Sequence, residues 1–174
     1  MNISKEQKAL ETAIDNYSRQ LGIIPDELFT VTPPKGGWSY AEVYDHTLQM
    51  AIISSVAMER CANLKGELNS GGLSPLGRLV FFLGRFPFVK LKVPAKVAAK
   101  NPVKKITREE AKALILKLNK RLNNTVPLIN EENAYSRIKH PRLGMLNAFE
   151  WLKFIRIHTE HHLKQLARIK KNLN

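Results

Sequence analysis

Four segments of the chain open with the same signal for the start of a helix. In each, a residue that can cap a helix is followed three positions later by Glu or Gln, and then by an apolar pattern of helical period. The four pairs are Ser4–Gln7, Ser39–Glu42, Thr107–Glu110 and Asn147–Glu150. In this arrangement the first side chain accepts from a free backbone N–H, and the Glu or Gln reaches back to the cap residue. One match is common by chance, but four predict helices over about 4–21, 39–65, 107–123 and 147–172.

The rest of the chain shows little alternating strand pattern and no internal repeat, so the economical architecture is an all-α four-helix bundle. A length of 174 residues and a hydrophobic content of 44% suit one domain, 1–174, with a real core. The polar N-terminus lacks the apolar stretch of a signal peptide, and no apolar run is long enough to span a bilayer. The single cysteine, Cys61, excludes an intramolecular disulfide and fits a cytoplasmic protein.

The connection between the second and third helices, 66–106, is far longer than a bundle turn. It is rich in Gly and Pro and also contains several Phe residues, which need burial. We therefore expect an ordered segment that packs along the bundle, with a short helix around 75–84. A functional lid or a peripheral membrane contact is a less favoured interpretation. The stretch 124–146 is expected to be a second ordered excursion.

The net charge of +13 is unevenly distributed, because residues 68–108 carry nine Lys and Arg but no acidic residue. Such a segment can meet anionic lipid, nucleic acid or an acidic ligand, although a solvated basic face is the simpler interpretation. A nucleic-acid partner is disfavoured, since the sequence has no recognition motif and its basic residues are mixed with Phe and Pro.

Three of the five histidines lie in HTEHHLKQL, residues 158–166. On the fourth helix the predicted inward stripe comprises Trp151, Ile155, His158, His162, Leu166, Ile169 and Leu173. His158 and His162 therefore stand where a bundle normally has Leu or Ile, and their i, i+4 spacing directs both rings the same way. His161 is displaced by about 100° around the helix and is not expected to share their site.

The second helix has an inward stripe of the same kind, comprising Val43, His46, Met50, Ile53, Ala57 and Leu64. A buried imidazole without a partner is costly, and three that converge on one cation avoid that cost. Neutral imidazole is a good ligand for zinc, nickel, copper or iron, and three protein nitrogens leave a position open. From spacing alone, hydrogen-bonded structural histidines are an equally good interpretation.

Three stretches resemble DinB-like (YfiT-like) proteins: GWSYAEVYDH at 37–46, HTEHHLKQLARI at 158–169 and HPRLGMLNAFEWLKF at 140–154. The last resembles more narrowly an uncharacterised branch with His-Pro and Gly before the final helix. The resemblance implies an up-down-down-up bundle, with His46, His158 and His162 holding a divalent zinc, nickel or iron ion, and frequent homodimers. Relatives include transferases and isomerases that use bacillithiol, mycothiol or glutathione, and metal-dependent hydrolases.

A metal at this position offers two chemistries on a small substrate. It stabilises the thiolate of a low-molecular-weight thiol for attack on an electrophile, or it lowers the pKa of a bound water for hydrolysis. The alternatives are a bundle that binds a metal and a small ligand without turnover, and a basic protein associated with membrane surfaces or nucleic acid.

Several other side chains are candidates for supporting roles. Arg78 and Arg85 are the first choices for binding an anionic substrate, and Trp38 either lines the cavity or staples the helix that Ser39 caps. His140 either faces the pocket mouth or belongs to a turn.

Residues next to the predicted ligands along the chain are harder to assign. Asp45 and Glu160 are expected to be surface carboxylates rather than partners of the imidazoles. Gln165 either supports a ligand or is polar surface, and Cys61 is expected to lie in the core.

Overall fold

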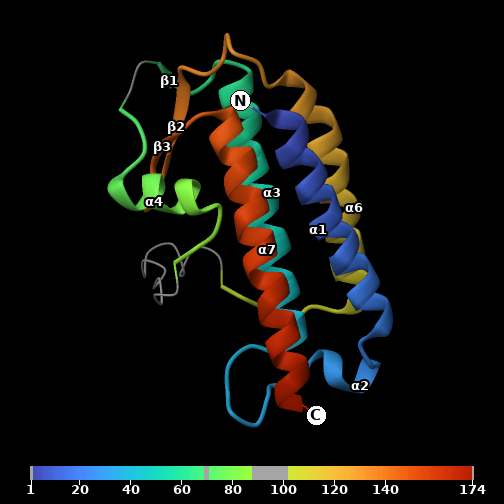
Figure 1. The fold of residues 1–174 in the computed structure, drawn as a ribbon. Coiled ribbons are helices and arrows are strands. Elements are labelled where there is room, and N and C mark those ends of the chain that lie inside the picture. The colour runs from blue at the N-terminus through green and yellow to red at the C-terminus, as the bar shows by residue number, and fades with distance from the viewer. Residues whose placement is uncertain (1, 69–70, 88–101, 174) are drawn as a thin grey trace.

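The computed structural model describes residues 2–68, 71–87 and 102–173, and its main body consists of four long helices (Figure 1). These are α1 (Ile3–Ile23), α3 (Tyr40–Ala62), α6 (Arg108–Thr125) and α7 (Ala148–Leu173). Helix α3 packs against both α6 and α7, and α7 also packs against α1. Because α1 and α7 run opposite to α3 and α6, the predicted up-down-down-up bundle is confirmed (Figure 1).

The shorter elements lie at the two ends and along one side of the bundle (Figure 1). They are α2 (Asp26–Phe29), α4 (Pro75–Leu83), the 3-10 helix η1 (Val126–Leu128), β1 (Glu67–Leu68), β2 (Ser136–His140) and β3 (Gly144–Leu146). The short helix expected around 75–84 is therefore present as α4.

The strands were not expected, and they form an antiparallel sheet in the order β1-β2-β3. Leu68 pairs with Ser136, and Ile138 pairs with Leu146. Strands of two to five residues are too short for alternation to stand out, and β1 and β2 lie far apart in the sequence. Their pairing is a tertiary contact, which explains why local pattern did not reveal it.

Three of the four predicted capping boxes are present. Reciprocal hydrogen bonds join Ser39 with Glu42, Thr107 with Glu110 and Asn147 with Glu150. The first helix differs, because it begins one residue earlier and is capped by Asn2, whose side chain accepts from the backbone N–H of Lys5. The prediction of Ser4 as its cap was wrong, since an equally good cap stands two positions before it.

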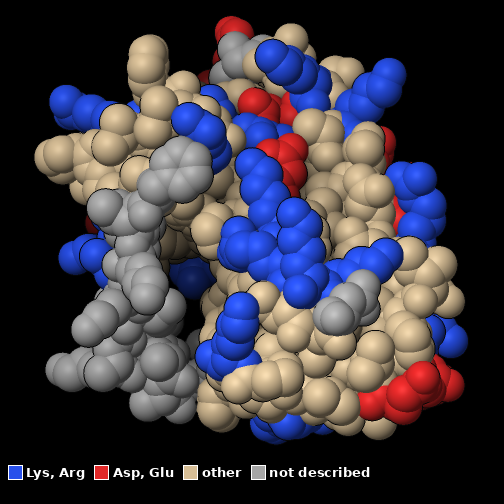
Figure 2. Space-filling view, turned by 60° about the horizontal axis from the view of Figure 1, so that its bottom comes forward, with Lys and Arg blue, Asp and Glu red and all other residues tan. Residues whose placement is uncertain are grey.

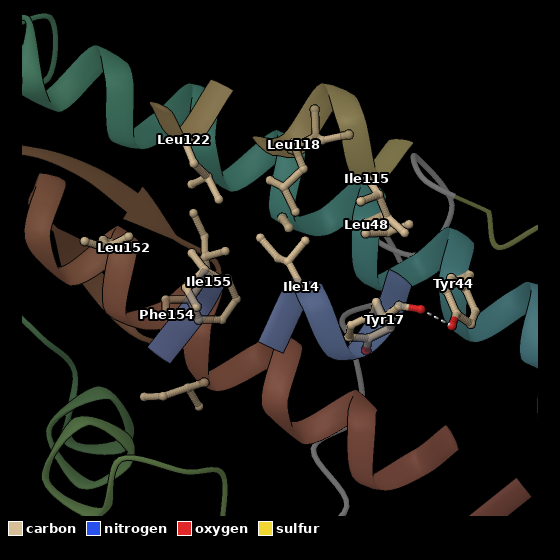
Figure 3. Close-up of a cluster of buried hydrophobic side chains, with 14 of the residues drawn as sticks. Ile14, Tyr17, Tyr44, Leu48, Ile115, Leu118, Leu122, Leu152, Phe154 and Ile155 are labelled. Carbon is tan, nitrogen blue, oxygen red and sulfur yellow. Dashed lines mark hydrogen bonds between the residues drawn. The ribbon is translucent and has the colours of Figure 1, made fainter. Parts of the chain in front are cut away.

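Side chains from all four long helices meet in one core (Figure 3). At its centre the rings of Tyr17 and Tyr44 pack edge-on at 5.2 Å, and the Tyr44 hydroxyl donates to the carbonyl of Tyr17. Cys61 is fully buried as predicted, and burial raises the pKa of its thiol to about 11.

The predicted stripes agree with the core on α7 but only in part on α3. From Trp151 to Ile169 the α7 stripe is buried. Ile53 on α3 is 46% exposed, and Leu64, which lies beyond the end of the helix, is 48% exposed, which corrects the prediction for the distal half of that stripe. Because α3 contacts both α6 and α7, its buried face is broad. A single stripe counted in heptads from Val43 therefore does not describe this face.

The position of α4 against the sheet can be tested at Gly77. A Cβ added there would overlap the carbonyl oxygen of Leu143, whereas at Gly71 it would meet open space. Gly77→Ala should therefore lower the free energy of unfolding by about 1–3 kcal/mol, the usual cost of overpacking. Denaturant unfolding of Gly77→Ala and the control Gly71→Ala measures this. Equal stability of the two variants would contradict the packing described.

Candidate metal centre

Three histidines from two helices meet inside the bundle. One ring nitrogen each from His46 on α3 and from His158 and His162 on α7 lie within 4.8 Å of one another. Ring centroids are 5.1 Å apart for His46 and His158, 4.8 Å for His46 and His162, and 4.6 Å for the α7 pair. His158 is 9% exposed and His162 7%, and His46 is partly buried. The packing of α3 along α7 thus brings together the three residues predicted from the sequence.

A buried tyrosine fixes the register of the two helices at the level of the histidines. The Tyr17 hydroxyl, from α1, donates to the carbonyl of Thr159 at 3.3 Å and lies 3.4 Å from the hydroxyl of Thr47. These partners directly follow His158 and His46 in the sequence. Burial raises the pKa of Tyr17, so its hydroxyl remains a donor. This link was not predicted, although Tyr17 does lie on the inward face of the first predicted helix.

The environment keeps all three imidazoles neutral. Burial lowers the pKa of His46 to about 4, against the opposing effect of Asp45, and that of His162 to about 3. Burial also holds the pKa of His158 well below its usual value, with a further decrease from His162 and His46. A neutral ring carries one free lone pair, which is the form that binds a metal ion.

Two hydrogen-bonding observations support the fit of a metal to this cluster. The Nδ1 of His162 lies 2.7 Å from the Oε1 of Gln165, an acceptor, so this nitrogen carries the proton and Nε2 has the lone pair. The Nδ1 of His158 is buried and has no hydrogen-bond partner among the described residues. Three neutral nitrogens suit a transition metal such as zinc, nickel or iron better than magnesium or calcium. The residues present therefore fit the ion that the resemblance implies.

Aromatic side chains surround the cluster. The ring of Trp38 lies 4.9 Å from that of His46 and is nearly parallel to that of His162 at 6.2 Å. Phe86 presents an edge to His158 at 6.3 Å, and Phe154 lies 5.6 Å from the same ring. Trp38 is therefore at the site, as one of its two predicted roles requires. Phe86 was not predicted at the site. The sequence indicated only that the Phe residues of the long connection need burial.

An open pocket of about 240 Å³ lies beside His46. Its described lining comprises Asp45, His46, Gln49, Met50, Pro102, Val103 and Lys104. Asp45 was expected on the surface but is 4% exposed, because its carboxylate accepts from the backbone N–H of Lys104 at 2.8 Å. The backbone at Lys104 therefore lies over this side chain of α3. Arg78 and Arg85 are not among the described lining residues, and the cation found there is Lys104.

The remaining candidates can be placed by their hydrogen bonds. His140 is the last residue of β2, and its Nδ1 accepts from the backbone N–H groups of Arg142 and Leu143 in the turn that follows. Burial lowers its pKa to about 4. Glu160 pairs with Arg156 at 2.7 Å rather than with a histidine.

His161 is exposed and does not belong to the group of three, as expected. Burial of part of its ring, together with Arg168 and Lys164, lowers its pKa. Both cations are exposed on α7, and Arg168 also lowers the pKa of His162. Lys and Arg also gather on the face of the bundle that comes forward in Figure 2, toward the end where α7 finishes. The surface next to the cluster therefore attracts anions.

A sequence model of the DinB superfamily matches residues 9–166, so the chain belongs to that superfamily. No curated protein matches the sequence significantly.

Three solved structures share the fold. TT2238, a four-helix bundle protein, aligns with a TM-score of 0.62 at 20% identity, over 95% of this chain and 98% of its own. YfiT from Bacillus subtilis is described as a probable metal-dependent hydrolase with an unusual four-helix bundle topology. It aligns with a TM-score of 0.67 at 14% identity, over 97% of this chain and 86% of its own. A mutant of the mycothiol-dependent maleylpyruvate isomerase aligns with a TM-score of 0.65 at 14% identity, over 95% of this chain but 61% of its own. At these identities the similarity establishes the fold alone.

Gln165 provides a test of how His162 is oriented. Gln165→Ala should weaken zinc binding about 10- to 100-fold, because the partner that fixes the ring and its tautomer is lost. Competition with a chromogenic chelator measures the affinity. The control Gln7→Ala removes a glutamine that pairs with Glu11 on the exposed side of α1 and should leave it unchanged. Equal affinity of the two variants would show that Gln165 does not support the site.

The depressed pKa values also predict how the metal-free fold responds to acid. Between pH 6.5 and about 4 the unfolded chain binds protons that the buried His46 does not, and for His162 this range extends to about 3. The contribution of these two histidines to the free energy of unfolding is therefore fully present above pH 6.5. It decreases as the pH falls, by up to about 1.4 kcal/mol per pH unit for each histidine. Denaturant unfolding with a chelator present, from pH 8 downward, measures the slope. His162→Gln should give a shallower slope, and an unchanged slope would contradict its burial as a neutral ring.

Proposed function

We propose that this chain is a metal-dependent enzyme that holds a divalent ion with His46, His158 and His162 and acts on a small anionic substrate. The observation that carries the proposal is the convergence of three neutral ring nitrogens within 4.8 Å of one another, next to an open pocket. A set of three protein ligands leaves a coordination position free, which is typical of catalytic rather than structural sites.

The surrounding residues have distinct tasks in this proposal. Gln165 holds the His162 ring in one tautomer, while Trp38 and Phe86 exclude water from the imidazoles. Lys104 in the pocket, with Arg168 at the nearby surface, attracts a carboxylate or similar anion. Met50 contributes apolar pocket lining for a hydrocarbon part of the substrate.

A divalent ion held by His46, His158 and His162 would supply one of two chemistries, since it would favour the thiolate form of a small thiol or lower the pKa of a water molecule. We favour thiol-dependent transfer, because a thiolate, once formed, needs no general base to attack an electrophile. The one carboxylate in the described pocket lining, Asp45, is already engaged with the backbone of Lys104. Hydrolysis is the second candidate. The printed descriptions of the mycothiol-dependent isomerase and of YfiT make both classes reasonable to test.

The first experiment measures metal content in protein purified without an affinity tag and offered zinc, nickel or iron. Wild type and His161→Ala should carry about one ion per chain, whereas His46→Ala and His162→Ala should lose most of it. His161→Ala is the matched control, since it removes an exposed imidazole adjacent to a proposed ligand. No stoichiometric metal in wild type would contradict the proposal.

The second experiment separates the two chemistries on the metal-loaded protein. Thiol transfer predicts that mycothiol, bacillithiol or glutathione is consumed with an electrophile, and that the rate is lost in His46→Ala. Hydrolysis predicts cleavage of esters or amides without any thiol. Stoichiometric metal without either activity across both panels would instead support a non-catalytic bundle that binds a metal and a small ligand.

A further inference from the structure

The helix α4 presents an apolar face to solvent. Its outward positions include Leu79, Phe82 and Leu83, which are 46%, 87% and 40% exposed. They recur at the three- and four-residue spacing that places side chains on one side of a helix. Phe82 is the most exposed large hydrophobic side chain in the described part of the chain. A helix of a globular protein normally directs charged or polar side chains outward at such positions.

This orientation is fixed by contacts on the opposite side of the helix. Gly77 lies against the carbonyl of Leu143 so closely that only glycine fits, and Val80 is fully buried. Ser74, the N-cap, accepts from the backbone N–H of Gly77 and also donates to the carbonyl of Arg142. Because α4 cannot rotate without breaking these contacts, Phe82 cannot turn inward.

The charged residues on α4 and directly after it are both arginines. Arg78 lies on the helix next to Phe82, and Arg85 follows its C-terminal cap, Gly84. The sequence contains no Asp or Glu between residues 68 and 108. An apolar stripe with arginines at its edges is the arrangement of helices that lie in the interface of anionic membranes.

We propose that α4 docks on the surface of an anionic lipid bilayer, with Phe82, Leu79 and Leu83 at the boundary of headgroups and acyl chains. Arg78 contacts a lipid phosphate in this arrangement. The bilayer accounts for both features at once, since it offers an apolar layer beneath a negatively charged one. A symmetric contact between two copies would bring the arginines of both together, and their repulsion disfavours it. A nucleic acid would match the charge but would leave the apolar side chains exposed.

Docking is a peripheral contact, because no helix in the described ranges is long and apolar enough to cross a bilayer. It does not depend on the proposed metal chemistry, since none of the residues involved belongs to the histidine cluster.

Co-sedimentation with vesicles tests the proposal. Wild type should bind vesicles that contain phosphatidylglycerol and should not bind vesicles of phosphatidylcholine alone. Phe82→Ser should reduce the partition coefficient by about tenfold or more, and Arg78→Gln by about fivefold. The matched control is Leu116→Ser on α6, where an apolar side chain that is 69% exposed is lost from another part of the surface. It should bind as wild type does. Thermal unfolding of each variant confirms that the fold is retained.

A fluorescent reporter identifies the docking element. Emission from Phe82→Trp should shift to the blue on binding to phosphatidylglycerol vesicles, whereas emission from Leu116→Trp should not shift. The proposal is overturned if wild type does not bind, if Leu116→Ser loses as much binding as Phe82→Ser, or if Phe82→Trp binds without a shift. It is also overturned if Phe82→Ser converts a dimer to a monomer in solution, because a second copy would then cover this face.

Discussion

The burial of three imidazoles between α3 and α7 is the constraint on which the rest of the structure depends. His158 and His162 are buried and His46 is partly buried, burial lowers the pKa of all three rings, and the Nδ1 of His158 has no partner among the described residues. A bundle built for stability alone would carry Leu or Ile at these inward positions. Burying these rings costs free energy unless their nitrogens find a partner. Three ring nitrogens within 4.8 Å of one another can share one partner, because they form a set of ligands for one metal ion.

Elements outside the two helices act to hold this arrangement. Tyr17 connects α1 to the residues that follow His46 and His158, and Gln165 fixes His162 from the next turn of α7. The chain after α4 brings Phe86 against His158, and the chain before α6 ties Lys104 to Asp45 at the pocket. The long connection 66–106, which looks irregular in the sequence, thus contributes walls to both the histidine cluster and its pocket. Function in such bundles depends on these local additions rather than on the fold itself.

The sequence predicted what depends on local pattern. Capping pairs located the starts of three helices, helical period placed His46, His158 and His162 inward, and a resemblance implied that the three hold one metal ion. What it missed depends on contacts between distant segments. The β1 and β2 pairing, the burial of Asp45 under the segment at Lys104, and the contact of Phe86 with the histidines all join residues separated by at least forty positions. On α3, two packing partners broadened the buried face, and a single stripe could not describe it.

The most direct test of the account is X-ray absorption spectroscopy at the zinc edge, on protein loaded with one equivalent of zinc. We expect multiple scattering from three imidazoles, with zinc–nitrogen distances of about 2.0–2.1 Å, and the loss of one imidazole from the shell in His46→Ala. A shell without imidazole, or an identical spectrum for His46→Ala, would contradict the assignment of the three histidines as a metal centre.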